Sequence, residues 1–134
     1  MVMTNAYEKY RTQEISMASP MALIVMLYNG CIKQLKLSGM AMEKNNYEEA
    51  NNSLKKAQDI VAELMSSLDF RYEISKNLMS LYSFIYEEIV RINASKDAAR
   101  IEPVVNILSD LRDTWAQVEK QCRPPAYEIS ELEQ

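Results

Sequence analysis

The sequence predicts an all-α protein, an antiparallel four-helix bundle with a short N-terminal cap segment. Its composition favours helix: only two of its 134 residues are glycine, nine are methionine, and Ala, Leu, Glu and Lys are common. Apolar residues recur at helical spacing in four segments joined by short polar connections, which is the pattern of a bundle. We expect the cap segment at 1–18, the bundle at 19–122 and a flexible, acidic tail at 123–134.

The first helix is expected from Pro20 to about Lys44. Ser19 suits the N-cap, and a proline at the first helical position loses no hydrogen bond. The apolar residues that follow fall on two sides of the helix: Leu23, Leu27 and Cys31 on one, and Val25, Tyr28 and Ile32 on the other. A bundle helix needs only one apolar stripe, so either another segment or a partner covers the surplus.

The dipeptide Asn29-Gly30 is a hairpin signal in other contexts. We interpret it as part of the first helix, because its flanks lack strand alternation and the helical pattern continues through Ile32, Leu35 and Met42. A glycine inside a helix lowers stability relative to alanine, and we expect Gly30 to allow another backbone to approach.

The second helix is expected over 47–68 and the fourth from Ala98 or Glu102 to Gln121. Both carry a seam with alternating gaps of three and four residues. In the second helix the seam comprises Tyr47, Ala50, Leu54, Ala57, Val61, Leu64 and Leu68, widened by Ile60 and Met65. In the fourth it comprises Ile101, Val104, Leu108, Leu111, Trp115, Val118 and Cys122. Pro103 belongs in a first turn, so regular helix should begin near Ile101, and Trp115 is expected in the core.

The third helix is expected over 72–93. Its stripe comprises Ile74, Leu78, Leu81, Ile85, Ile89 and Ile92, with Tyr82 and Tyr86 alongside. Asn45-Asn46 should end the first helix and cap the second, Asp69 should end the second, and Asp97 should cap the segment that follows it.

Composition also bounds the class of function. The net charge of −4 disfavours nucleic acid, and the chain has neither an apolar run long enough to span a membrane nor a secretory signal. These features predict a cytoplasmic protein without membrane insertion. Cys31 and Cys122 fit buried thiols of a reducing compartment, with a disulfide as the alternative.

Histidine is absent, which excludes a His general base and a His-metal site. No Gly-rich phosphate loop or CxxC pair is present either, so we expect no metal, no cofactor and no enzyme activity. Glu87 and Glu88 beside Arg91 form the one candidate carboxylate site. Adjacent helical residues point about 100° apart, so a solvated face with a Glu87–Arg91 pair is the better interpretation.

The remaining candidates are binding residues. Five methionines stand before residue 43, at positions 17, 21, 26, 40 and 42, and they either fill core gaps or form an adaptable surface for a partner helix. Tyr7 and Tyr10 share a face if their segment is helical, and Tyr28, Tyr82 and Tyr86 suit a half-wet interface. The pattern favours a helix-in-groove binder without identifying its ligand.

An ordered set of motifs resembles a known family, the flagellar secretion chaperone FliS. The set comprises Tyr7…Tyr10-Arg11-Thr12-Gln13, Ala18-Ser19-Pro20, Leu23-Ile24-x-Met26-Leu27-Tyr28-Asn29-Gly30, Ala57-Gln58-Asp59-Ile60-Val61-x-Glu63-Leu64, Leu68-Asp69, Leu78…Leu81-Tyr82 and Ile107-Leu108-x-x-Leu111-Arg112-x-x-Trp115. One departure is Arg71-Tyr72 before Glu73-Ile74, where the family often has glycines, so the turn there is expected to differ.

The resemblance implies a cytosolic export chaperone that binds the disordered C-terminal segment of flagellin. It would prevent premature polymerisation and assist delivery to the flagellar type III secretion apparatus, with the N-terminal segment acting as a cap over the binding surface. The export gate and regulatory proteins are further candidate partners. The residues assigned to partner binding are Tyr7, Tyr10, Leu23, Met26, Leu27, Tyr28, Ile60, Leu64, Leu78 and Tyr82.

Three hypotheses compete at this stage, and the third is a carboxylate-based enzyme, against which an empty metal analysis of the purified protein would count. A chaperone, monomeric or weakly dimeric, should lose flagellin binding on Leu27→Asp. The alternative is a regulatory or structural bundle that dimerises through the apolar patch of its first helix.

Overall fold

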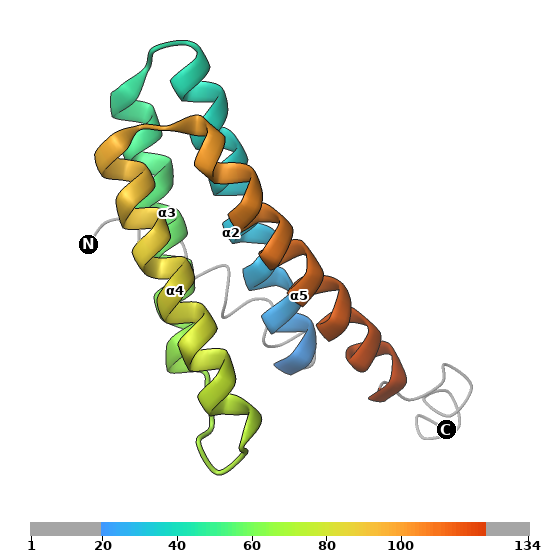
Figure 1. Cartoon of the computed structure of the whole chain (residues 1–134). Helices are drawn as coiled ribbons and strands as arrows, with labels where there is room; N and C mark the ends of the chain where they lie inside the picture. Colours follow the sequence, from blue (N-terminus) through green and yellow to red (C-terminus); the bar gives the residue numbers. More distant parts are fainter. Residues whose placement is uncertain (1–19, 123–134) are drawn as a thin grey trace.

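The computed structural model describes residues 20–122, and these form four long helices. They are α2 (Pro20–Glu43), α3 (Tyr47–Ser66), α4 (Ile74–Ser95) and α5 (Ile101–Cys122), with a short 3₁₀ turn, η1 (Ala98–Arg100), before α5. Successive helices run in opposite directions (Figure 1). The predicted all-α four-helix bundle is therefore confirmed, and α5 begins at Ile101 as Pro103 predicts. The predicted cap segment, the Ser19 N-cap and the predicted tail lie outside the described residues.

The helix α2 occupies the centre of the arrangement. It packs extensively against α3 on one side and α5 on the other, while α4 packs chiefly against α3. Contacts between α4 and α5 are few, and Figure 1 shows these two helices diverging from the connection that joins them. The bundle is therefore closed on its α2–α3 and α2–α5 sides and sparsely packed on its α4–α5 side.

The core contains the seam residues that the helical spacing predicts. Fully buried members come from all four helices and include Leu35, Leu54, Val61, Leu64, Ile85, Ile89, Ile92 and Leu108. Cys31 is a buried free thiol whose Sγ lies 3.7 Å from the carbonyl oxygen of Ala57. Burial raises the pKa of this thiol to about 12, so it stays protonated and unreactive. The prediction of a buried thiol is confirmed for Cys31, and the side chain of Cys122 is not described.

The predicted caps are confirmed at two helix starts. Asn46 Oδ1 accepts a hydrogen bond from the backbone N–H of Glu49 at 3.2 Å. Asp97 Oδ1 likewise accepts from the N–H of Ala99 at 3.1 Å. Each cap satisfies a donor that has no partner within its own helix.

The connection at 67–73 carries the Arg71-Tyr72 departure from the family pattern. Arg71 forms an ion pair with Asp69 at 2.6 Å, and Ser75 Oγ donates to the Asp69 carbonyl oxygen at 2.6 Å. Positive φ angles occur elsewhere in the described part of the chain, at Asn45 and Lys96, but at none of these positions. The turn therefore needs no glycine, and Arg71 and Tyr72 adopt it without backbone strain.

Several sequence predictions are wrong in detail. Tyr47 and Ile74, predicted in apolar stripes, are 49% and 57% exposed, since each is the first residue of its helix and lies beyond the packed region. Trp115 is half-buried rather than a core residue. A Cβ at Gly30 would meet the Ile60 side chain at 3.4 Å, so what approaches Gly30 is a side chain rather than a backbone.

Among residues 20–122, no helix is long and apolar enough to cross a bilayer.

Candidate functional site

The described part of the chain holds no group of three acidic, Cys or His side chains arranged to bind a metal. The Glu87–Arg91 pair predicted as a solvated i,i+4 contact is present at 3.8 Å, with both side chains more than half exposed. Glu88, whose side chain is only 14% exposed, pairs with Arg91 at 3.4 Å and with Arg100 at 2.9 Å, and the second pair ties α4 to η1. The carboxylates of α4 therefore form ion pairs with neighbouring arginines.

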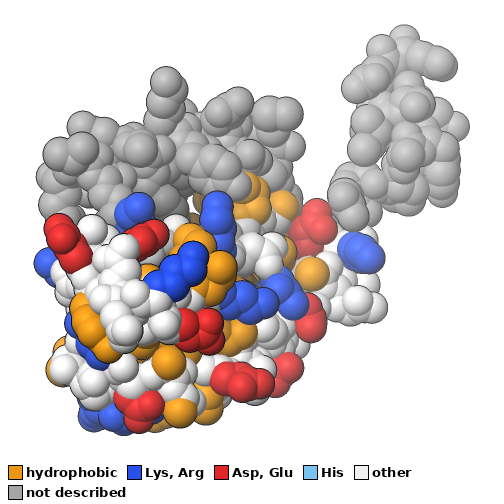
Figure 2. Space-filling view, turned by 90° about the horizontal axis from the view of Figure 1, so that it is seen from above, with side chains coloured by type: hydrophobic (Ala, Val, Ile, Leu, Met, Phe, Trp, Pro, Cys, Tyr) orange, Lys and Arg blue, Asp and Glu red, His pale blue; other side chains and the backbone are white. Residues whose placement is uncertain are grey.

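Figure 2 views the end of the bundle where the α2–α3 and α4–α5 connections lie. Hydrophobic side chains there alternate with charges of both signs, and Lys and Arg side chains gather near the middle of the view. This mixed surface lacks the single-sign field that would favour nucleic acid.

Three aromatic side chains, one each from α2, α4 and α5, form a cluster. The hydroxyls of Tyr28 on α2 and Tyr82 on α4 lie 2.5 Å apart, and their rings are tilted with centroids 6.3 Å apart. The indole N–H of Trp115 on α5 interacts with the Tyr28 hydroxyl. This aromatic cluster (Tyr28, Tyr82 and Trp115) joins α4 to the other helices on the sparsely packed side.

Burial is the main cause that raises the pKa of the Tyr28 hydroxyl, and its hydrogen bond to Tyr82 raises it further. Burial also raises the pKa of Tyr82, partly offset by the hydrogen bond from Tyr28. Trp115 lowers the pKa of Tyr28, as expected of a donor to its oxygen. Both hydroxyls are therefore neutral at physiological pH, and the directions of the shifts fit a chain in which Trp115 donates to Tyr28 and Tyr28 donates to Tyr82.

Further half-buried apolar side chains lie on the three helices that carry the aromatic cluster. They pack against the core without being covered completely by the described helices: Ile24 on α2, Leu78 and Leu81 on α4, and Ile107 and Leu111 on α5. We call these five residues together with Trp115 the α4–α5 surface. This surface stays partly exposed because α4 and α5 make few contacts with each other. In a closed bundle, the apolar stripes of these two helices would be buried between them.

The structure divides the predicted partner-binding residues into three groups. Tyr7 and Tyr10 lie outside the described residues. Leu23, Met26 and Leu78 are half-buried at the surface. The others belong to the hydrophobic core: Leu27, Tyr28, Ile60, Leu64 and Tyr82. Of the ten, the structure brings Tyr28 and Tyr82 into direct contact.

Sequence reasoning did not assign four residues of the α4–α5 surface to partner binding: Leu81, Ile107, Leu111 and Trp115. Their positions in apolar stripes gave the only available signal, and that signal is shared with the core. It also missed the hydrogen bond from Arg112 Nη1 to Asn29 Oδ1, 3.1 Å long, which ties α5 to α2 close to the aromatic cluster.

Comparison with known proteins gives a consistent result. The family profile described as "Flagellar protein FliS" matches residues 3–122. The chain is 34% identical over 117 residues to the flagellar secretion chaperone FliS of Bacillus subtilis, covering 87% of this chain and 88% of the relative. It is 32% identical over 125 residues to the protein of the same name from Vibrio cholerae, covering 91% and 88%.

The fold has a counterpart among solved structures. A crystal structure of a flagellar chaperone from bacteria superposes with a TM-score of 0.72 at 21% sequence identity, covering 88% of this chain and 98% of that one. This likeness supports the four-helix architecture independently of the sequence matches.

Proposed function

This chain belongs to the FliS family of flagellar secretion chaperones, and we propose that it binds the disordered C-terminal segment of flagellin in the cytoplasm. Binding would prevent premature polymerisation and assist delivery to the flagellar type III secretion apparatus. The export gate and regulatory proteins are further proposed partners. The proposal involves no catalysis, cofactor or nucleic acid.

The observation that carries the proposal is the half-buried apolar surface of a bundle with one sparsely packed side. On α2 the side chains from Met21 to Met26 are half-buried, and the α4–α5 surface adds residues from two more helices. Apolar side chains arranged along helices suit the apolar face of an amphipathic segment. Covering that face on the bundle would remove it from self-association, so the mechanism is burial and not chemistry.

The energetics require a large contact. Ordering a disordered segment costs roughly 2–5 kcal/mol or more, and coupled folding and binding usually buries about 1,000–3,000 Å². Leu23, Met26 and Leu78 alone cannot supply this area, so we propose that the partner lies along several helices. Contact with core residues such as Tyr28 and Tyr82 additionally requires α4 to move away from α2, which the few contacts between α4 and α5 make less costly.

The sequence carries no phosphate-binding loop, so release would come from competition or handover rather than from nucleotide hydrolysis.

The test is calorimetric titration of the full chain with a peptide of the last ~40–50 residues of the cognate flagellin, long enough to follow a bundle about 30 Å long. One-to-one binding with a large negative heat-capacity change is expected. A folded protein that shows no heat of binding and no competition with fluorescent peptide would contradict the proposal.

Site variants sharpen the test. Leu23→Asp and Met26→Asp should weaken peptide binding, because each places a carboxylate on a half-buried apolar surface. Val90→Asp on α4 is the matched control, since it makes the same kind of change at a side chain that is already 44% exposed. Equal loss of affinity in all three variants would contradict the assignment of the surface.

A further inference from the structure

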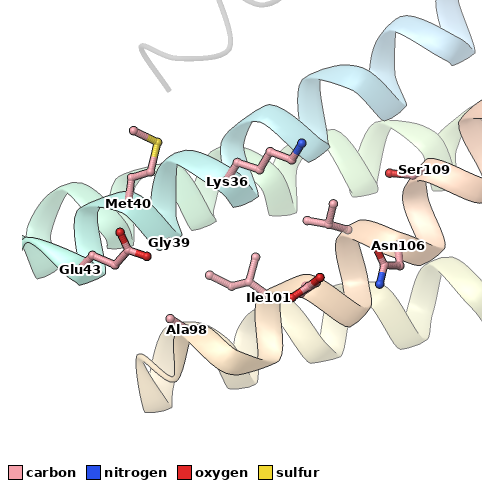
Figure 3. Close-up of a pocket in the computed structure, with 10 residues that line it drawn as sticks. Lys36, Gly39, Met40, Glu43, Ala98, Ile101, Asn106 and Ser109 are labelled. Atoms are coloured by element: carbon pink, nitrogen blue, oxygen red, sulfur yellow. The ribbon is translucent and has the colours of Figure 1, made fainter.

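Helix α5 is fastened to α2 at two places. A groove of about 610 Å³ lies between the C-terminal half of α2 and the start of α5, and its apolar lining includes Gly39, Ile101 and Val105. Figure 3 shows Ile101 pointing across this groove toward α2, where a Cβ at Gly39 would meet its side chain at 3.4 Å. The second tie is the 3.1 Å hydrogen bond from Arg112 to Asn29, about 15 Å nearer the start of α2 at 1.5 Å per residue. These ties and the extensive packing between α2 and α5 fix the two helices to each other.

The second half of α4 is also fastened to its neighbours. Asn93 Nδ2 donates a hydrogen bond to Asn51 Oδ1 on α3 at 2.8 Å. Glu88 forms an ion pair with Arg100 of η1 at 2.9 Å. The isoleucines in this half of the helix are fully buried. The end of α4 that leads into η1 is therefore held by both polar contacts and packing.

The first half of α4, residues 74–82, is held differently, and we call it the flap. Its apolar side chains Leu78 and Leu81 are only half-buried. Within residues 20–122, the polar contact that joins the flap to another helix is the one between the hydroxyls of Tyr82 and Tyr28, 2.5 Å apart. The flap makes few contacts with α5, so this hydroxyl pair is its main tie across the bundle.

The chemistry of the hydroxyl pair suits a contact that opens and closes. Both tyrosines are almost fully buried, so in the closed state each hydroxyl depends on a protein partner. In an open state both hydroxyls regain hydrogen bonds with water, so separating them costs only the small net value of the bond. Exposure of the two rings keeps the closed state dominant. The contact is also lost within about 1 Å of separation, which makes the closed and open states distinct.

The flap lies at the open end of the bundle. Figure 1 shows α4 and α5 diverging from the connection that joins them, so the two helices are furthest apart at the flap. We propose that the flap is hinged on α3 and latched by the Tyr28–Tyr82 contact, and that its opening admits the partner segment between α2 and α4. The connection at 67–73 would move with the flap, because Ser75 Oγ donates to the Asp69 carbonyl oxygen. The inference rests on the proposed function for its ligand and adds the element that controls access.

Two substitutions separate a latch from general stabilisation of the bundle. Tyr28→Phe keeps the ring but leaves the Tyr82 hydroxyl buried without its partner in the closed state, whereas that hydroxyl reaches water in the open state. The open population should rise roughly tenfold, toward the lower end of the range for a buried polar group that loses its partner. Adding Tyr82→Phe removes the unpaired hydroxyl, so the double variant should return to within about threefold of the wild type. Trp115 loses its acceptor in both variants, so that loss cancels between them.

Hydrogen exchange of the free full chain tests the latch without a partner. In the wild type, the amides of residues 78–82 should exchange by local opening, faster than the core amides of α3. Tyr28→Phe should accelerate them roughly tenfold, and the double variant should reverse most of this change. Asn46→Ala is the matched control, since it weakens the start of α3 away from the latch and should leave these amides within about twofold of the wild type. Equal acceleration in all four helices of Tyr28→Phe, or a double variant that exchanges faster than the single one, would overturn the proposal.

Titration with the flagellin peptide tests whether the flap controls access. If the open state binds the peptide, the apparent dissociation constant falls as the open population rises, so Tyr28→Phe should bind roughly tenfold more tightly than the wild type. The double variant and Asn46→Ala should both bind within about threefold of the wild type. Unchanged or weaker binding by a Tyr28→Phe protein whose flap exchanges faster would overturn the proposal. A wild type that binds no peptide would instead contradict the proposed function, and the exchange pattern would still decide whether the flap is hinged.

Discussion

The aromatic cluster allows a sharp test of what holds α4 in place. Tyr28→Phe removes the hydroxyl that contacts both Tyr82 and Trp115 and keeps the ring in the core. The Tyr82 hydroxyl, on a side chain that is 1% exposed, then loses its hydrogen-bond partner. A buried polar group left without a partner costs about 1–3 kcal/mol, and we expect the free energy of unfolding to fall by that amount.

Tyr82→Phe should cost less than Tyr28→Phe. Removing the Tyr82 hydroxyl leaves the Tyr28 hydroxyl with Trp115 as its donor, so the Tyr28 hydroxyl loses only the group to which it donates. The double variant removes both hydroxyls together and leaves no unpaired oxygen between the two rings. Its loss should therefore be smaller than the sum of the single losses, with a coupling energy of about 0.5–1.5 kcal/mol.

Urea unfolding measures these values, followed by circular dichroism for the whole bundle and by fluorescence for the cluster. Trp115 is the single tryptophan of the chain, so its emission reports on this site alone. Parallel shifts of both probes would show that the bundle unfolds as one unit. Additivity of the two single substitutions within about 0.3 kcal/mol would refute the reasoning, because independent sites behave that way.

Three further predictions concern pH, a helix cap and the groove. Burial raises the pKa values of Tyr28 and Tyr82 above the ordinary value of 10.0, so the unfolded chain ionises these hydroxyls first as the pH rises. The free energy of unfolding should therefore be full below pH 10 and fall above it by about 1.4 kcal/mol per pH unit for each hydroxyl that stays protonated. Denaturation followed by tyrosinate absorbance checks this, and the double Phe variant should flatten the pH dependence. Asn46→Ala should lower the free energy of unfolding by about 1 kcal/mol in urea titration, because the N–H of Glu49 loses its acceptor. Gly39→Ala should raise it by up to about 1 kcal/mol, since the new methyl group meets Ile101 at an ordinary distance, and a loss of stability would show that the contact is strained.

The helices and their caps were predictable because they depend on local chemistry. The seams of three- and four-residue gaps placed Leu54, Val61 and Leu108 in the core, and the Asn46 and Asp97 side chains act where their sequence context indicates. The errors at Tyr47 and Ile74 have a common cause. A periodic pattern gives the face of a residue but does not say how far packing extends toward the end of a helix, and both residues are the first of their helices and exposed.

The division between core and surface was not predictable in the same way. Tyr28 and Tyr82 are 54 residues apart in the sequence, and no local pattern indicates that their hydroxyls share a hydrogen bond. Apolar spacing also looks the same for a buried seam and for a surface that awaits a partner, because both depend on the removal of apolar area from water. Half-burial of Trp115 follows from the divergence of α4 from α5, which is a property of the assembled bundle.

The same division decides which substitution can test the chaperone function. Leu27→Asp is the change that the sequence suggests, but Leu27 is a core residue with 6% of its surface exposed. A carboxylate there would be buried without a partner, so the variant would lose stability by several kcal/mol, and its failure to bind a peptide would report unfolding. Leu23 lies one helical turn earlier and is half-buried, so an aspartate at that position can reach water while still disrupting an apolar contact with a ligand. We therefore expect Leu23→Asp to keep a helical circular dichroism spectrum and a urea midpoint close to those of the Val90→Asp control. We also expect it to lose affinity for the flagellin peptide. Unchanged affinity in that folded variant would show that the binding surface does not include the start of α2.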